Sequence, residues 1–116
     1  MAASQEELSH TAISLDGART VRTADQSHSL LLEAFRTASS ITVDCSQITE
    51  ADLSLVQLLL SARKSAAAGG KRLTLSHAAE GALGSVLARG GFLTPDSPDG
   101  QRAFWLMSEA SDENRS

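Results

Sequence analysis

The 116-residue sequence has one cysteine, no excess of basic residues and no long apolar run. A single thiol, Cys45, excludes an internal disulfide framework and a zinc site built from cysteines. The formal net charge of -4 gives no overall basic footprint for nucleic acid or anionic lipid. Without an apolar stretch of about 20 residues, no segment is expected to insert into a membrane. Residues 1–9 are polar, unlike a secretory signal, so we expect a small acidic cytoplasmic protein.

The composition is that of one globular domain, with 41% hydrophobic and 21% charged residues. A chain of this length buries roughly two-thirds of its unfolded surface, which is enough for a single core. The two ends, residues 1–9 and 108–116, are polar and rich in serine, and we expect both to be flexible tails. The folded domain is therefore expected over residues 10–107.

The first part of the domain has the pattern of two strands and a helix. Residues 10–15 place apolar side chains on one side, as a strand does. The Asp-Gly pair at 16–17 predicts a hairpin, with a weaker return strand over 18–22. Residues 23–26 have the form of a capping box, in which a Thr oxygen and a Gln side chain satisfy backbone N–H groups. We expect a first helix over 24–38.

The middle of the sequence predicts a strand followed by a long helix. Residues 40–45 alternate apolar and polar side chains and form the clearest strand pattern in the chain. A loop is expected over 46–51, before a helix capped by either Thr49 or Asp52. The glycines at 69–70 end this helix.

The long helix has apolar rows and a polar row at helical spacing. The apolar rows are predicted to face the core, and they consist of Leu53, Val56 and Leu60 together with Leu55, Leu59 and Ala62. The polar row consists of Ser54, Gln57, Ser61 and Lys64.

The last part of the domain predicts a strand over 72–76 and a helix over 78–89 that ends at the glycines 90–91. Residues 103–107 are apolar and fit either a strand or a helix. The whole order of elements predicts an α/β fold. We expect a single-domain mixed β-sheet with an N-terminal hairpin, parallel central strands and right-handed helical crossovers.

The patterns of common enzyme and cofactor sites are missing. A dinucleotide site needs a glycine-rich turn between strand and helix, but residues 46–51 contain no glycine. The Gly-Gly pairs follow helices, where they serve as caps. The three histidines are scattered without metal-ligand spacing. Asp44 lacks the acidic cluster of a phosphoaspartate site. We therefore expect neither a metal nor a cofactor, and no catalytic activity.

Cys45 is the one candidate nucleophile of an enzyme. It alternates with Ile41 and Val43, which favours a buried, unreactive thiol over a reactive one. Labelling of the thiol in the native protein separates the two interpretations.

Ser54 lies in the first turn of the long helix. Unsatisfied backbone N–H groups and the positive end of the helix favour an anion there, such as a phosphoryl group on a serine. A capping or solubilising serine is the alternative interpretation of this position.

The sequence from 41 to 75 resembles the core of the STAS domain, which is named for sulphate transporters and anti-sigma factor antagonists. That family has a strand ending in Asp, a short loop, Asp-Ser-Ser-Gly-Leu opening an apolar helix, a glycine and another strand. Here Val43–Asp44 ends the strand, and residues 52–56 read Asp-Leu-Ser-Leu-Val. Residues 57–60, Gln-Leu-Leu-Leu, continue the helix, and 69–70 and 72–75 supply the glycine and the next strand. The order of elements extends the resemblance to about residues 10–107.

The alignment with the family depends on register. Counting from Asp44, the family's first Ser falls on Leu53, its phosphoacceptor Ser on Ser54 and its Gly on Leu55. A register one residue earlier pairs Ala51 with the Asp and leaves no phosphoacceptor. The first register keeps the spacing and places Ser54 on the polar row. The Gln-Leu-Leu-Leu form resembles divergent bacterial STAS domains that accompany chemotaxis operons or phospholipid-transport ABC systems.

The resemblance implies a non-catalytic signalling module that binds a protein partner through the start of the long helix and the loop before it. In the anti-sigma branch the partner is a GHKL-type serine kinase, and phosphorylation of Ser54 adds about −1.5 to −2 charges that repel it. The alternatives are a small regulatory subunit on an ABC-transporter ATPase and an adaptor in a chemotaxis-linked pathway. The candidate partner-binding residues are Asp44, Ser46, Gln47, Thr49, Glu50, Asp52, Ser54, Gln57 and Ser61.

Overall fold

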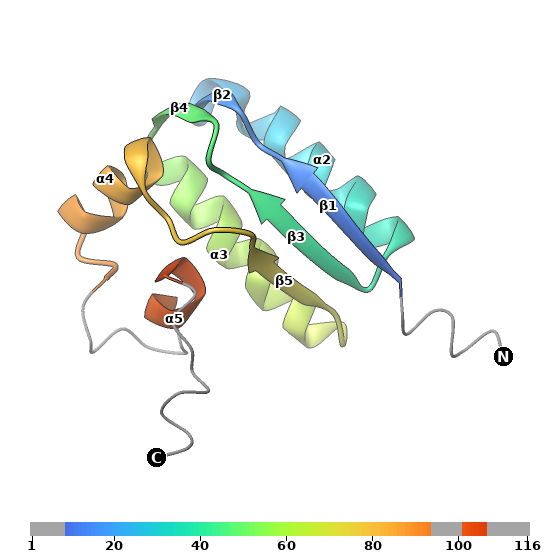
Figure 1. Cartoon of the computed structure of the whole chain (residues 1–116). Helices are drawn as coiled ribbons and strands as arrows, with labels where there is room; N and C mark the ends of the chain where they lie inside the picture. The colour runs from blue at the N-terminus through green and yellow to red at the C-terminus, as the bar shows by residue number, and fades with distance from the viewer. Residues whose placement is uncertain (1–8, 94–100, 107–116) are drawn as a thin grey trace, which may run out of the picture.

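The structure, a computed structural model, describes residues 9–93 and 101–106 (Figure 1). Strands, helices and one 3-10 helix (η1) alternate along the chain. In order they are β1 (His10–Ser14), β2 (Gly17–Arg19), η1 (Val21–Thr23), α2 (Ala24–Thr37), β3 (Ser40–Asp44), β4 (Ile48–Ala51), α3 (Leu53–Ala68), β5 (Arg72–Leu75), α4 (Gly81–Arg89) and α5 (Gln101–Leu106).

The strands form one sheet in the order β1-β3-β5 and a two-stranded sheet of β2 and β4. Each pairing is parallel. Between the two sheets, the N–H of Leu15 donates to the carbonyl of Asp44 at 3.0 Å and the N–H of Gly17 to that of Gln47 at 3.1 Å. Residues 10–19 therefore run alongside residues 40–51 in the same direction. The predicted α/β class with parallel strands is confirmed.

The predicted N-terminal hairpin is wrong, because β2 does not reverse onto β1 but pairs in parallel with β4. Gly17 does adopt the left-handed conformation expected of a turn glycine, with φ of +68°. It bends the chain without reversing it, since the backbone groups on both sides of the bend bond to the same neighbouring segment. Part of the loop expected over 46–51 is strand β4, which supplies that neighbour.

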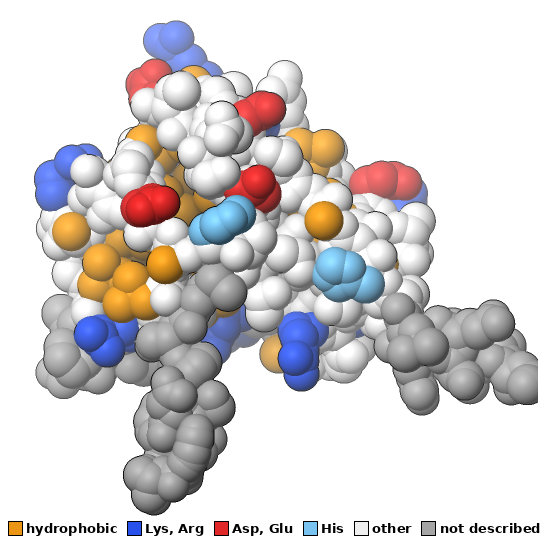
Figure 2. Space-filling view, viewed as in Figure 1, with side chains coloured by type: hydrophobic (Ala, Val, Ile, Leu, Met, Phe, Trp, Pro, Cys, Tyr) orange, Lys and Arg blue, Asp and Glu red, His pale blue; other side chains and the backbone are white. Residues whose placement is uncertain are grey.

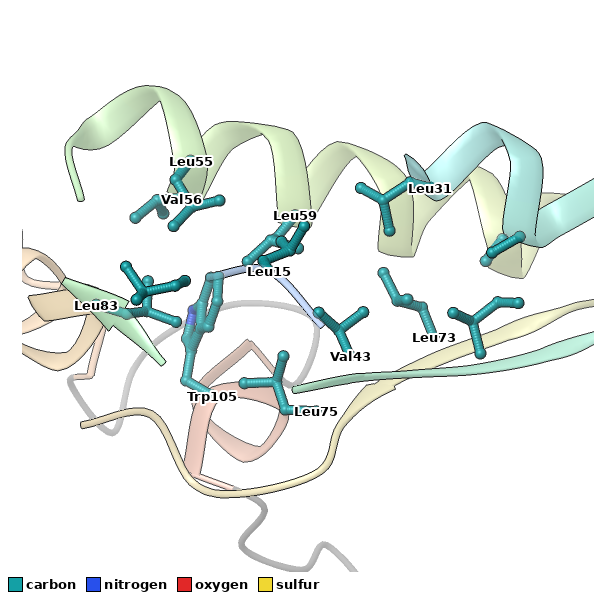
Figure 3. Packing of buried hydrophobic residues seen from close by; sticks show 14 of the residues in the cluster. Leu15, Leu31, Val43, Leu55, Val56, Leu59, Leu73, Leu75, Leu83 and Trp105 are labelled. Atoms are coloured by element: carbon teal, nitrogen blue, oxygen red, sulfur yellow. The ribbon is translucent and has the colours of Figure 1, made fainter. Parts of the chain in front are cut away.

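The main core lies between the β1-β3-β5 sheet and the helices α2 and α3, which lie side by side behind the sheet in Figure 1. Alternate side chains of the strands point toward the helices, as the alternation of residues 40–45 predicts. Trp105 of α5 closes one end of this core and is fully buried (Figure 3). The side chains labelled in Figure 3 are Leu15, Leu31, Val43, Leu55, Val56, Leu59, Leu73, Leu75, Leu83 and Trp105.

The start of α2 differs from the prediction. The capping box is formed by Thr20 and Thr23 around η1, three residues before the predicted one, and Thr23 makes no side-chain cap to α2. Thr23 Oγ1 instead accepts from the N–H of Thr20 and donates to the carbonyl of Ala18. The helix itself begins at Ala24, as expected.

The inward row predicted for α3 is correct at Leu55, Val56 and Leu59 but wrong at Leu53, which is 48% exposed. Leu53 is the first residue of the helix, which Asp52 caps. Because helical side chains tilt toward the N-terminus, the side chain of the first residue extends beyond the packed layer. The helix ends at the predicted glycines, and Gly70 has φ of +73°.

The last helices complete the described chain. Helix α4 begins at Gly81 rather than at residue 78. Gly81 has φ of +59°, and a right-handed helix that started at residue 78 could not run through a residue with this backbone conformation. The undecided segment near 103–107 is helix α5 over 101–106. The tails expected at 1–9 and 108–116 lie outside the described residues except for Ser9. Within the described residues, none of the helices has the length and apolar character needed to span a membrane.

Candidate functional site

The start of α3 is organised by one carboxylate, that of Asp52. Its Oδ1 accepts from the backbone N–H of Ser54 at 3.0 Å and from the Ser54 hydroxyl at 2.5 Å. Asp52 is thus the N-cap of α3, one of the two predicted caps, and it satisfies a backbone donor that the first helical turn leaves open. The Ser54 hydroxyl, more than any other group, holds the pKa of Asp52 below its ordinary value of 3.8. The carboxylate is therefore ionised at neutral pH.

The second oxygen of Asp52 reaches a different part of the chain. Its Oδ2 accepts from the backbone N–H of Val21 at 3.1 Å, although the two residues are 31 apart in the sequence. Val21 is the first residue of η1, and its side chain is 69% exposed. One carboxylate therefore fixes η1 against the first turn of α3.

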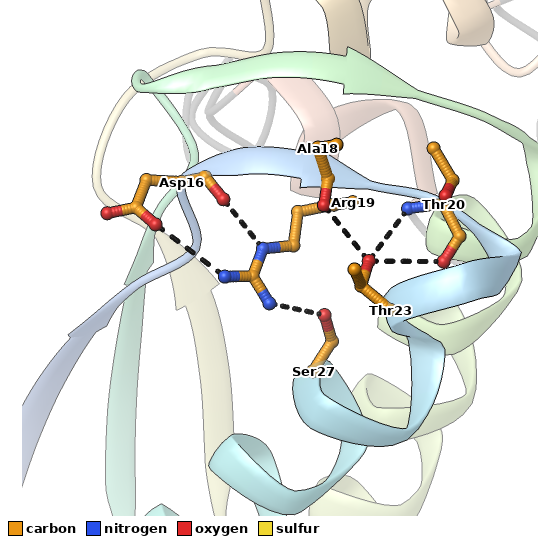
Figure 4. A network of polar contacts seen from close by, with 6 residues as sticks. All are labelled: Asp16, Ala18, Arg19, Thr20, Thr23 and Ser27. Atoms are coloured by element: carbon orange, nitrogen blue, oxygen red, sulfur yellow. Dashed lines mark hydrogen bonds and ion pairs between the residues drawn. The ribbon is translucent and has the colours of Figure 1, made fainter.

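A polar network holds η1 in place from its other side (Figure 4). Arg19 donates to the carbonyl of Asp16 at 2.8 Å and to the hydroxyl of Ser27 at 3.1 Å, and its guanidinium lies 3.6 Å from the Asp16 carboxylate. Ser27 is buried in α2. Because this cation is paired and its side chain is only 12% exposed, it acts inside the fold and adds little positive charge to the surface.

Asp44 and Ser46 form a second cluster, at the end of β3. Asp44 Oδ1 accepts from the hydroxyl of Ser46 at 2.6 Å and from its backbone N–H at 2.9 Å. These two bonds, the hydroxyl first, lower the pKa of Asp44, and His77, 3.8 Å away, adds to the effect. His77 Nδ1 also lies 2.9 Å from the Ser76 hydroxyl. The contacts of Asp44 thus join the ends of β3 and β5, not the start of α3.

The remaining predicted site residues lie on exposed parts of both regions. Gln47 donates to Ser46 at 3.5 Å in the turn after β3. Thr49 and Glu50 are exposed on β4, and Gln57 and Ser61 are exposed on α3. Ser61 lies seven residues beyond Ser54, which is about 10 Å along a helix. Glu50 lines a cleft together with Asp52, which Thr49 does not, so the candidates for one surface centred on the start of α3 are Glu50, Asp52, Ser54 and Gln57.

A cleft of about 410 Å³ separates η1 from β4 and the cap of α3. Its walls combine small side chains with two acidic residues and one arginine. They are formed by Ala18, Thr20, Val21, Arg22, Thr23, Glu50, Ala51 and Asp52. The sequence patterns given above do not predict the contribution of residues 18–23 to this cleft, although the Thr20–Thr23 spacing is a capping-box signal that marks where η1 begins.

Cys45 is partly buried and packs against the core. Burial, with a smaller effect of the neighbouring Asp44 carboxylate, raises the pKa of its thiol to about 12. The thiolate needed by a cysteine nucleophile is therefore scarce at neutral pH, which favours the interpretation as an unreactive thiol. In residues 9–93 and 101–106, no three His, Cys, Asp or Glu side chains are grouped so that they could hold a metal ion.

The fold is a parallel α/β domain in which an aspartate-capped helix begins beside an exposed apolar side chain. Its family is shown by sequence: residues 2–93 match the family described as "Mlab, STAS domain", and the chain belongs to the STAS domain family. The resemblance stated from the sequence is thereby confirmed. STAS domains are in general interaction modules without catalytic activity. By its family, the chain therefore belongs to the class of regulatory or interaction modules.

A solved structure supports the same fold. The STAS domain of a SulP transporter from Vibrio cholerae is similar to this chain with a TM-score of 0.51 and 14% sequence identity. The match covers 74% of this chain and 66% of that one, just under two-thirds of its length. At this identity the likeness concerns the fold alone. No curated protein sequence matches the chain.

Proposed function

We propose that this protein is a regulatory module that binds a protein partner through a docking surface formed by Val21, Glu50, Asp52, Leu53, Ser54 and Gln57. The observation that carries the proposal is the exposure of Leu53, at 48%, directly beside the Asp52–Ser54 cap. Val21 is exposed as well, at 69%, and Asp52 binds its backbone N–H, so one carboxylate orders the backbone of two exposed apolar residues. An exposed apolar patch surrounded by polar groups is typical of a contact surface, whereas a single exposed leucine is not. Membership of the STAS family supports an interaction role in general.

Phosphorylation of Ser54 is the proposed switch of this surface. The Ser54 hydroxyl donates to Asp52, so a phosphoryl group there replaces a hydrogen-bond donor with about −1.5 to −2 charges. The lowered pKa of Asp52 keeps its carboxylate ionised, and the two anions repel. We expect the cap to open and the partner to leave. A GHKL-type serine kinase with anti-sigma activity is the partner that this mechanism fits.

A second candidate function is constitutive docking on an ABC-transporter ATPase or in a chemotaxis-linked complex. The apolar side chains of Val21 and Leu53 favour it, because they are exposed without any modification and supply contact area to a partner that is always bound. In that case Ser54 serves only as part of the helix cap.

The test is photo-crosslinking in the native host, with a benzophenone amino acid at Gln57 and a matched control at Ala67. Both positions are exposed on α3, one at its front and the other near its end. We expect a discrete protein adduct from position 57 and none from 67. The same adducts at both positions, or none at 57, contradict the proposal.

The identity of the adduct and its response to Ser54 variants separate the two functions. For the phosphorylation switch, the adduct is a serine kinase, Ser54→Asp abolishes it and Ser54→Ala retains it. For constitutive docking, the adduct is an ABC ATPase or a chemotaxis protein, and Ser54→Asp and Ser54→Ala behave alike. Equal adducts with Ser54→Ala, Ser54→Asp and Ser54→Arg contradict a role for this position in either complex.

A further inference from the structure

We propose that the docking surface selects a partner whose contact face has an apolar centre surrounded by arginine or lysine side chains. This inference rests on the proposed function and specifies the chemistry of the partner at the same surface.

The apolar centre of the docking surface is formed by two side chains from distant parts of the chain. Val21 is 69% exposed and Leu53 is 48% exposed. The N–H of Val21 donates to Asp52, and Leu53 directly follows Asp52, so the same residue anchors both side chains. Their apolar surface is held out by ordered backbone, and a partner that covers it does not have to order a flexible segment first.

The cleft beside Val21 and Asp52 carries a small net negative charge. Two carboxylates, of Glu50 and Asp52, and one cation, Arg22, line the cleft, which leaves it a net charge of −1. On the face drawn in Figure 2, the acidic side chains lie mostly in the upper half, toward the β2–β4 end, where basic side chains lie at the top as well. Complementary charge on a partner accelerates encounter and sets orientation.

The cleft can accept a long cationic side chain. Asp52 Oδ1 accepts two hydrogen bonds and Oδ2 accepts one, and a carboxylate has about four acceptor sites. With the Leu55 N–H, which also bonds to this carboxylate, the acceptor sites of Asp52 are taken up inside the fold. The carboxylate of Glu50 lines the same cleft and has neither a hydrogen bond nor an ion pair among the described residues, so it is the group available to a cation. An arginine fits this arrangement best, because its planar group donates to more than one oxygen at once.

A symmetric contact between two copies of this chain is a poorer occupant. A two-fold interface brings together two patches that each have a net charge of −1, because the carboxylates of Glu50 and Asp52 outnumber the single cation, Arg22, in each copy. A partner with basic residues at the rim meets the same apolar pair without that repulsion.

The experiment is an NMR titration of the 15N-labelled full chain with three synthetic 12-residue peptides. The first alternates arginine and leucine, the second has every arginine replaced by glutamate, and the third has every leucine replaced by serine. We expect saturable amide shifts around Val21, Glu50 and Leu53 with the first peptide, weaker shifts with the third and none there with the second. Equal shifts with the glutamate peptide, shifts confined to another surface, or no shifts with any peptide overturn the proposal.

Paired variants test the residues themselves with the arginine–leucine peptide as the probe. Glu50→Gln is expected to weaken binding by about two- to fivefold, the range of an exposed ion pair, while Glu33→Gln on α2 leaves it unchanged. Val21→Ser is expected to weaken binding, and Leu32→Ser, at an exposed leucine of α2, is its control. Equal effects of a variant and its control overturn the proposal.

The two proposals fail in different ways. If crosslinking at Gln57 captures a partner but the glutamate peptide binds as well as the arginine peptide, the docking function stands and the cationic partner is wrong. If crosslinking captures nothing at Gln57, the proposed function itself is wrong, whatever the peptides do.

Discussion

Of the three Asp-X-Ser segments in the chain, two have nearly the same local geometry, one at the end of β3 and one at the start of α3. In each, the serine donates both its backbone N–H and its hydroxyl to one aspartate oxygen, at 2.9 and 2.6 Å for Ser46 and at 3.0 and 2.5 Å for Ser54. Both aspartate pKa values are lowered, and in both cases the serine hydroxyl is the largest cause. Local chemistry alone therefore does not distinguish them.

The difference lies in what surrounds each segment. Asp52 begins a helix and binds the N–H of Val21, whereas Asp44 ends a strand and lies near His77. The middle residues point in opposite directions, since Cys45 packs against the core and Leu53 is exposed. The proposed docking surface is placed at the second segment, because there the aspartate orders the backbone beside the exposed side chains of Val21 and Leu53.

The largest expected effect is a difference in thiol reactivity between the two middle positions, 45 and 53. With a pKa of about 12 against 9.0 for an ordinary thiol, Cys45 has about a thousandfold less thiolate at pH 8. We expect a thiol reagent to label native Cys45 far more slowly than the thiol of a Leu53→Cys variant made in a Cys45→Ala background. In denaturant the two rates should agree, and equal rates in the native proteins contradict the comparison.

The next largest expected effect is the loss of stability when either aspartate, Asp52 or Asp44, is replaced by alanine. Asp52→Ala is expected to lower the free energy of unfolding by about 1–2 kcal/mol, because it removes the helix cap and leaves the Val21 N–H without its acceptor. Asp44→Ala should cost less, since its hydrogen bonds are exposed to water. Urea denaturation of both variants measures the difference. An equal or larger loss for Asp44→Ala shows that the contact with Val21 contributes little.

The pH dependence follows from the lowered pKa values. A carboxyl whose pKa is lower in the folded chain stabilises the fold fully above the unfolded value, 3.8 for aspartate, and loses this as the pH falls through the folded value. We expect unfolding free energy to fall with decreasing pH below about 4. We expect the unfolding free energy to depend less on pH in the Asp52→Asn variant than in the Asp44→Asn variant. Urea denaturation at several acidic pH values provides the measurement, and parallel curves for wild type and both variants refute the assignment.

The serines give the smallest expected effect. Ser54→Ala should cost about 0.5–1 kcal/mol, because its hydroxyl donates to an ionised carboxylate at a partly buried position while the backbone N–H bond remains. Ser46→Ala should cost less, since its hydroxyl bond is exposed. Thermal or urea denaturation of the two variants tests this. An equal loss of unfolding free energy in both shows that the partial burial of the Ser54 hydroxyl does not make its hydrogen bond more stabilising than that of Ser46.

Much of the fold could be predicted because local patterns encode it. The alternation of residues 40–45 placed Ile41 and Val43 in the core, and glycines 69–70 end α3 as predicted. The hairpin was wrong because an Asp-Gly pair favours a bend but does not choose the strand that follows it. Strand β4 was missed because ITEA is a short segment with one buried side chain, Ile48.

The candidate site was only partly predictable. Asp52 and Ser54 were found from helix-start chemistry, which acts within a few residues. The spacing of Leu53 fits the apolar row and predicts a core position, and the pattern of residues 18–22 predicts a return strand that includes Val21. Their exposure depends on where the helix starts relative to the sheet, and spacing alone does not contain that information.

The sequence by itself determined the α/β class, the strand over residues 40–44 and the glycine stop of α3, because alternation and glycine stops depend on neighbouring residues. It left the cap of α3 open between Thr49 and Asp52. Only the tertiary structure decided that residues 17–19 pair with 48–51, that the Val21 N–H meets Asp52, and that the last apolar segment is helix α5 with Trp105 buried. Those outcomes depend on contacts between residues far apart along the chain, where the competing arrangements satisfy the same local preferences.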